Sequence, residues 1–93
     1  MRIIGNIDHP VLKITIFKID NKLSVKFETG LYEQTYKFRM GDLIKSAEDI
    51  RTIVDQKFLE EVLDNFNRMT RSKNTSIDRN LAKLDEEEFD DII

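Results

Sequence analysis

The sequence predicts an α+β fold, in which an antiparallel β-meander of three or four strands is followed by one main helix packed on one face. Two observations predict it. Residues 11–19, 22–28 and 31–39 alternate apolar and polar side chains and are separated by two-residue turns. Residues 56–71 instead repeat apolar side chains at helical spacing. The chain has 93 residues, and we expect residues 1–71 to form a single domain.

The first turn sets the register of the meander. A turn at Asp20-Asn21 pairs Ile16 with Val25, and the pairing repeats at every second residue along the two strands. Apolar side chains then meet on one face, as a half-buried sheet requires.

The second turn selects the same inside face. A turn at residues 29–30 pairs Phe27 with Tyr32, which again joins apolar side chains. Residues 2–5 can add a fourth strand. Pro10 separates it from the next strand, because proline has no backbone N–H to donate to a ladder.

The second half of the chain is predicted to form two helices. A short one over about residues 46–54 is indicated by Ser46 followed by Asp49, which resembles a capping box. Its apolar residues and those of the next segment centre about 140° apart on one helical wheel. A single straight helix could not face one core with both sets. The chain is therefore expected to break near Asp55, which can cap the second helix.

The end of the chain has a different composition. Residues 70–76 have no period and indicate a linker. Residues 72–93 are expected to form this linker, an optional short helix capped by Ser76 in which Ile77, Leu81 and Leu84 share a face, and an acidic tail. All 15 Lys and Arg lie in residues 1–83, whereas residues 84–93 hold six acids and no base. The body therefore carries a charge of +3 and the tail a charge of −6.

The tail is a candidate partner-binding segment. Acidic ends often serve solubility alone, and that interpretation stays open. The last five residues, however, combine acids with three large apolar side chains, which favours binding of a partner. These residues are Phe89, Asp90, Asp91, Ile92 and Ile93.

Composition argues against catalysis. The chain has no cysteine and one histidine, which excludes thiolate nucleophiles, cysteine-ligated metals and sites that need two imidazoles. None of the four serines neighbours His9, which precedes Pro10 in an expected loop. The three glycines are isolated and form no phosphate-binding loop. We therefore expect no enzyme, no cofactor, no metal and no small-molecule substrate.

We expect no hydrophobic targeting signal in this chain. No apolar run approaches the roughly 20 residues that span a bilayer. The sequence from Met1 to Asn6 lacks the apolar stretch of a signal peptide. We expect a cytoplasmic protein that does not contact a membrane.

The outer face of the sheet is the second candidate binding surface. It groups basic side chains around one aromatic ring: Lys13, Phe17, Lys26, Lys37 and Arg39. Basic side chains with a stacking ring on an open sheet are typical of single-stranded nucleic-acid platforms. The same face can instead mediate self-association, or be an ordinary solvated surface. A homodimer contact there would centre on Val11, Phe17, Ile19 and Leu31.

Three resemblances bear on function. The order of strands and long helix over about residues 2–70 resembles Whirly-type single-stranded-DNA-binding domains, which implies nucleic-acid binding. The ending Glu88-Phe89-Asp90-Asp91-Ile92-Ile93 resembles the acidic, hydrophobic-ended tails of bacterial and phage single-stranded-DNA-binding proteins, which recruit replication and repair partners. The run Gly30-Leu31-Tyr32-Glu33-Gln34-Thr35-Tyr36-Lys37-Phe38-Arg39 resembles small uncharacterised proteins of gut Bacteroidetes and their phages or mobile elements, which implies no activity.

Two hypotheses follow. The first is a non-enzymatic binding or assembly protein, either a homo-oligomer or an accessory subunit that binds a protein partner. The alternative is a single-stranded nucleic-acid-binding protein with an acidic partner-recruiting tail. A small enzyme ranks third.

Overall fold

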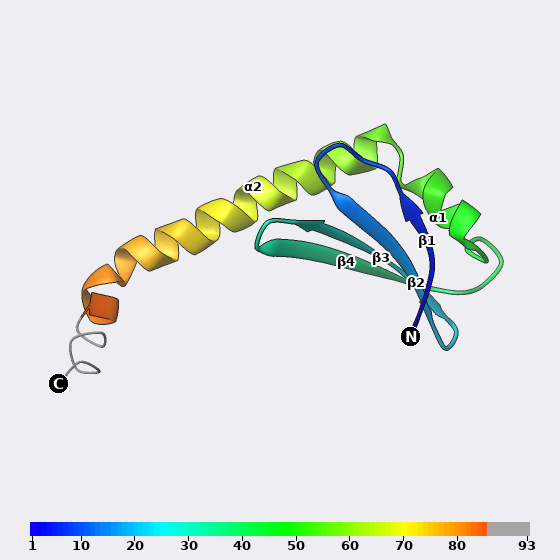
Figure 1. Cartoon of the computed structure of the whole chain (residues 1–93), viewed down its shortest axis with the longest axis horizontal. Helices are drawn as coiled ribbons and strands as arrows, with labels where there is room; N and C mark the ends of the chain where they lie inside the picture. The colour runs from blue at the N-terminus through cyan, green and yellow to red at the C-terminus, as the bar shows by residue number, and fades with distance from the viewer. Residues whose placement is uncertain (86–93) are drawn as a thin grey trace.

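The computed structural model describes residues 1–85, and the predicted tail residues Phe89 to Ile93 lie outside that range. Four strands form one antiparallel sheet in the order β1-β2-β3-β4, and α2 packs against it (Figure 1). The α+β meander predicted from the sequence is therefore confirmed. The elements are β1 Arg2–Ile7, β2 Lys13–Ile19, β3 Lys22–Thr29, β4 Tyr32–Arg39, α1 Ala47–Ile53 and α2 Gln56–Arg79.

The first hairpin has the predicted register and the second is shifted. Ile16 pairs with Val25 across the turn at Asp20, whose φ is 52°. Phe27, however, pairs with Gln34 and not with Tyr32. The second turn falls one residue later than predicted, because Gly30 takes the left-handed φ of 55° that glycine adopts without a steric penalty. The pairing shifts by two residues, so the same side chains still face the core.

The core lies between the inner face of the sheet and the two helices. Phe27 and Phe58 pack with ring centres 5.7 Å apart, and Tyr36 lies edge-on to both rings. These three rings join β3, β4 and the start of α2. The buried apolar cluster is Leu12, Ile14, Ile16, Leu23, Val25, Phe27, Ile50, Val54, Val62 and Phe66.

The break between α1 and α2 lies next to Asp55, as predicted. Asp55 precedes α2 and its side chain accepts a hydrogen bond from the Phe58 N–H at 2.9 Å. That bond satisfies one of the backbone donors left free at a helix start.

The end of α2 differs from the prediction. The helix continues to Arg79, and residues 81–85 are helical beyond a turn at Asn80. The linker expected over residues 70–76 is therefore wrong, and residues 77–79, expected to begin a separate short helix, belong to α2. The segment has no glycine or proline to stop a helix, and Ser76 lies inside it. The Asn80 side chain donates to the Ser76 carbonyl at 2.8 Å and marks the end instead.

The lengths of β1 and α2 complete the description of the fold. β1 extends two residues past its predicted end, with a register shift between Ile3 and Gly5. The molecule measures 58 × 28 × 22 Å, because α2 projects well past the end of the sheet (Figure 1). A 24-residue helix is about 36 Å long. A strand of eight residues spans about 27 Å, so the last part of α2 has no sheet beneath it.

Candidate functional site

The five basic and aromatic residues predicted for the outer face all lie there. The register places Phe17 beside Ser24, and Ser24 beside Lys37. Lys13, Lys37 and Arg39 are exposed, whereas Lys26 is half-buried. The structure therefore brings the cations to one face, as the strand alternation predicts.

Phe17 is not open on that face. Its side chain is 7% exposed, and the ammonium group of Lys26 lies 5.0 Å from the centre of its ring. Lys26 also pairs with Glu28 at 3.4 Å. A nucleic-acid base could stack on Phe17 only if Lys26 moved away. The expectation of an exposed ring among cations is wrong, because the side chain of the neighbouring strand covers it.

The outer face is hollowed beside β1. A groove of about 480 Å³ is lined by residues that include Ile3, Lys13, Phe17 and Lys26. His9 borders it, and its Nδ1 accepts the backbone N–H of Leu12 at 3.0 Å and that of Val11 at 3.1 Å. Both bonds organise the loop before β2, which agrees with a loop role for this histidine.

A second hollow is apolar and lies between α2 and the β3–β4 turn. We name it the apolar groove, and its volume is about 570 Å³. Val11 and Leu31 on its rim are 65% and 84% exposed. The groove is lined by Val11, Thr29, Gly30, Leu31, Tyr32, Leu63, Phe66, Asn67 and Thr70.

The apolar groove changes the predicted grouping of exposed residues. The sequence placed Val11 and Leu31 with Phe17 and Ile19 on one outer surface. Ile19 pairs with Lys22 at the other end of the hairpin, far along the strand from the β3–β4 turn. Val11 and Leu31 instead flank α2, so the four residues do not form one continuous patch.

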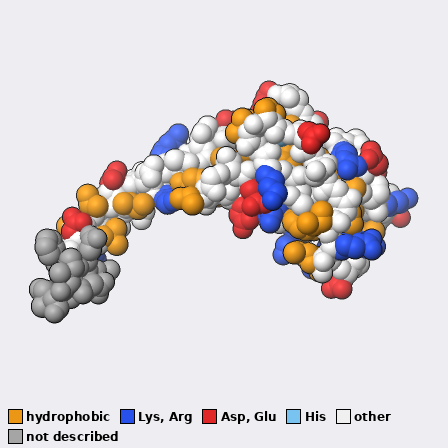
Figure 2. All heavy atoms as spheres, in the orientation of Figure 1, with side chains coloured by type: hydrophobic (Ala, Val, Ile, Leu, Met, Phe, Trp, Pro, Cys, Tyr) orange, Lys and Arg blue, Asp and Glu red, His pale blue; other side chains and the backbone are white. Residues whose placement is uncertain are grey.

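Beyond the apolar groove, α2 leaves the sheet. We name residues 71–85 the overhang, in which every residue is exposed except Ser76. Three large apolar side chains remain partly open there: Ile77 at 39%, Leu81 at 50% and Leu84 at 46%. Figure 2 shows hydrophobic side chains along the helix beyond the sheet.

These side chains continue a row that starts in the apolar groove. Leu63, Thr70, Ile77 and Leu84 follow one another at intervals of seven residues. Such an interval returns to nearly the same side of a helix after two turns. The sequence showed that Ile77, Leu81 and Leu84 share a face. It did not show the continuity with Leu63, because residues 70–76 were read as a linker.

Polar bonds fix the direction of α2 on the sheet. The Gln34 side-chain amide donates to the Val62 carbonyl at 2.8 Å, and the Tyr36 hydroxyl donates to Gln34 Oε1 at 3.0 Å. Asn65 donates to the same Gln34 oxygen at 3.4 Å. These bonds hold the middle of α2 against β4 and so set where the overhang points.

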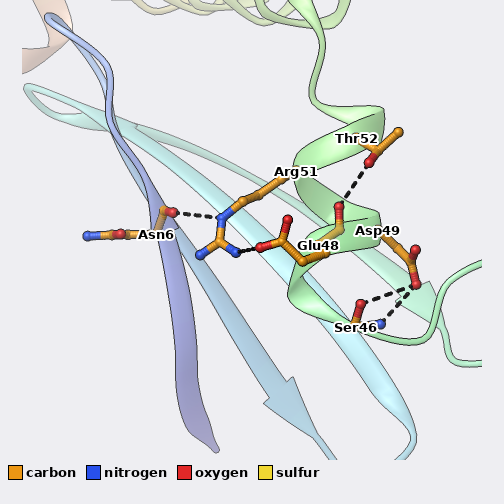
Figure 3. A network of polar contacts seen from close by, with 6 residues as sticks. All are labelled: Asn6, Ser46, Glu48, Asp49, Arg51 and Thr52. Carbon is orange, nitrogen blue, oxygen red and sulfur yellow. Dashed lines mark hydrogen bonds and ion pairs between the residues drawn. The ribbon is translucent and has the colours of Figure 1, made fainter.

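A separate polar network holds α1 against β1 (Figure 3). Arg51 Nε donates to the Asn6 carbonyl at 3.3 Å, and its guanidinium also pairs with Glu48. The Asp49 carboxylate accepts the Ser46 N–H at 3.1 Å, which is one half of the predicted capping box. The Arg51–Asn6 bond joins α1 to β1, and the other contacts stabilise or cap α1 itself, so we assign all of them a structural role.

The described residues can be assessed for metal-ligating clusters and for helices that could cross a membrane. Within residues 1–85, no three metal-ligating side chains lie together in a way that could hold an ion. Over the same range, no helix combines the length and apolar character needed to cross a membrane.

Comparison with known protein families, with curated proteins and with solved structures found no match to this chain.

Proposed function

We propose that this is a non-enzymatic binding or assembly protein, which associates with itself or with a protein partner through the apolar groove and the overhang. One observation carries the proposal. Partly exposed apolar side chains lie at Leu63 in the apolar groove and at Ile77, Leu81 and Leu84 on the overhang, where the sheet no longer covers the helix. Contiguous apolar surface rimmed by polar residues is typical of interaction sites.

The length of the overhang supports the same proposal. It contains 15 residues, and all of them except Ser76 are exposed. Most helices gain their stability from packing an apolar face. A partner laid against Ile77, Leu81 and Leu84 would supply the layer that the sheet does not.

The mass of the protein in solution tests the proposal. We expect light scattering at micromolar concentrations to give a multiple of 11.0 kDa. Leu81→Glu should lower that mass, because a carboxylate is costly to desolvate in an apolar contact. Thr75→Glu adds the same charge on the opposite side of the helix and should leave the mass unchanged. A monomeric mass at every concentration would contradict self-association.

Single-stranded nucleic-acid binding is the alternative. It is supported by the groove on the outer face, which Lys13 and Lys26 line, and by Lys37 and Arg39, which lie farther along the same face on β4. We expect binding there to fall steeply with salt, since cations that neutralise phosphates release counterions. Lys13→Ala combined with Lys37→Ala should flatten that dependence and leave the mass unchanged. If a labelled single-stranded oligonucleotide does not bind even at low salt, the alternative fails.

A further inference from the structure

We infer that a second copy of this chain pairs antiparallel with the free edge of β4, so that the sheets of the two copies join into one continuous sheet. The two-fold axis is perpendicular to the sheet and passes between the Tyr36 residues of the two copies. This inference goes beyond the proposed function, because the edge of β4 is a different surface from the apolar groove and the overhang.

The backbone along the outer edge of β4 is unpaired. β4 is the last strand of the sheet (Figure 1). The Met40 N–H donates to the Asn21 carbonyl at 2.8 Å, and antiparallel bonding alternates along a strand, so the even-numbered residues of β4 bond to β3. The N–H and C=O groups of the odd-numbered residues therefore point away from the sheet. Within residues 1–85, no turn, loop or side chain bonds to these groups, which belong to Glu33, Thr35, Lys37 and Arg39.

The opposite edge of the sheet is protected. β1 has a register shift between Ile3 and Gly5, and Arg51 Nε of α1 donates to the Asn6 carbonyl at 3.3 Å (Figure 3). Irregular or covered edges of this kind hinder pairing with another chain. The eight residues of β4 instead pair with β3 without any register shift. Of the two edges, β4 is therefore the one suited to accept another strand.

The inner face of β4 is only partly covered by α2. Val25 and Phe27 on β3 are 0% exposed, whereas Tyr36 and Phe38 on β4 are half-buried. The cover that α2 provides therefore ends at β4, and the plane of the sheet beyond this strand stays open. A strand added beside β4 would bury the open sides of both rings.

The charges along β4 favour an antiparallel second copy. A two-fold axis at Tyr36 keeps the inner faces of both sheets together and pairs all four residues whose backbone groups point outward. Glu33 then lies opposite Arg39 of the second copy, and this pair occurs twice. A parallel, in-register pair would put each charge opposite its own kind. An axis at Thr35 would put Arg39 opposite Leu31, in the turn, and leave its backbone unpaired.

A proline tests the edge without removing β4 from its own sheet. The Thr35 N–H points outward, so Thr35→Pro keeps the bonds to β3 and removes a donor that the second copy needs. Thr35→Val keeps that donor. We expect Thr35→Pro to weaken association at least tenfold and to lower the mass measured by light scattering, and Thr35→Val to leave it unchanged. Circular dichroism will verify that both variants fold.

A charge exchange tests the direction of pairing. Glu33→Arg and Arg39→Glu should each weaken the dimer by about tenfold, since each puts like charges opposite one another at two places. The double exchange should recover the original affinity, because it restores opposite charges at the same places. Lys13→Glu reverses a charge two strands away from the edge and should leave the affinity unchanged.

Disulfides test the register, since the chain has no cysteine of its own. Directly opposed residues 35 and 37 of the two copies would have Cα atoms about 5.5 Å apart, within the range of a disulfide. The two copies of residue 35 are diagonal neighbours about 7–8 Å apart, beyond that range. An equimolar mixture of Thr35→Cys and Lys37→Cys proteins should therefore oxidise mainly to the mixed dimer.

The outcomes separate this inference from the proposed function. If Thr35→Pro and the charge reversals leave the mass and affinity unchanged, the inference is overturned, while association through the overhang is judged separately by Leu81→Glu. A mass lowered by Thr35→Pro but not by Leu81→Glu supports the β4 edge and contradicts the overhang. If Thr35→Pro does not fold, the charge exchange decides. Thr35→Cys linking mainly to itself would overturn the register at Tyr36, and a monomeric parent chain would end both the inference and self-association.

Discussion

The ammonium group of Lys73 lies 5.1 Å from the centre of the Tyr32 ring. Tyr32 begins β4, and Met69 is the last residue of α2 that packs against the core. This contact therefore attaches the first turn of the overhang to the edge of the sheet. It adds to the bonds from Gln34 that set the direction of α2.

We expect Lys73→Met to loosen the overhang. Methionine keeps an unbranched apolar chain and removes the charge, so the change isolates the cation–ring attraction. A contact of this kind at an exposed site contributes about 0.5–1 kcal/mol. The free energy of unfolding should fall by no more than that, and amide exchange in residues 74–79 should become faster. Arg71→Met removes a charge on the opposite side of the helix and should leave exchange unchanged. Equal effects of the two variants would contradict a specific role for Lys73.

Phe66→Ala should be strongly destabilising. Phe66 is 5% exposed and belongs to the core cluster between sheet and helix. Truncating a buried phenylalanine costs about 3–5 kcal/mol, through lost burial and the cavity left behind. Urea unfolding will measure it. Asn67→Ala changes the adjacent, exposed residue and should stay within about 0.5 kcal/mol of the parent. If Phe66→Ala melts within a degree or two of the parent, α2 does not pack as described.

Gly5 and Arg51 should be coupled. A Cβ built on Gly5 would lie 2.8 Å from Arg51 Nη2, so an alanine there must displace the guanidinium. The displacement would break the bond from Arg51 Nε to the Asn6 carbonyl. We expect Gly5→Ala to cost about 1 kcal/mol, the value of one such hydrogen bond.

The matched background for that change is Arg51→Ala. With the guanidinium gone, Gly5→Ala meets no close contact from it and reduces the freedom of the unfolded chain. It should then be neutral or stabilising by about 0.5 kcal/mol. A double-mutant cycle from urea unfolding gives the coupling. The same cost for Gly5→Ala in both backgrounds would show that Arg51 is not what it meets.

Local patterns predicted the elements that depend on local chemistry. The two-residue period and the turn at Asp20 were enough to give the register of β2 and β3. Asp55 identified the break between the helices, because a cap needs only a carboxylate three residues before a free N–H. The second turn was misplaced by one residue, since both Thr29-Gly30 and Gly30-Leu31 suit a two-residue turn and only the φ of Gly30 distinguishes them.

Features that depend on distant contacts were not predictable in the same way. Residues 70–76 hold no large apolar side chain, because the sheet does not cover this part of α2, and they therefore resembled a linker. Phe17 was expected to be exposed. Strand alternation predicts the face on which a side chain lies, but it does not predict that the Lys26 side chain of the neighbouring strand covers the ring. The apolar groove joins Val11, Leu31 and Leu63, which lie far apart in the sequence.

Ser24→Ala should stabilise the protein. Ser24 lies on the outer face of β3 and is 3% exposed, and among the described residues its Oγ is buried without a hydrogen-bond partner. A buried hydroxyl that makes no bond costs about 1–3 kcal/mol of desolvation, and alanine removes the oxygen while nearly keeping the shape. Alanine also has a lower preference for strands, which offsets part of the gain. We therefore expect the free energy of unfolding to rise by about 0.5–1 kcal/mol in urea titrations. Thr35→Val removes an exposed hydroxyl from the same face and should change it by less than about 0.5 kcal/mol. If Ser24→Ala is instead destabilising by about 1 kcal/mol, the hydroxyl has a partner in solution, most simply a water molecule between the strands.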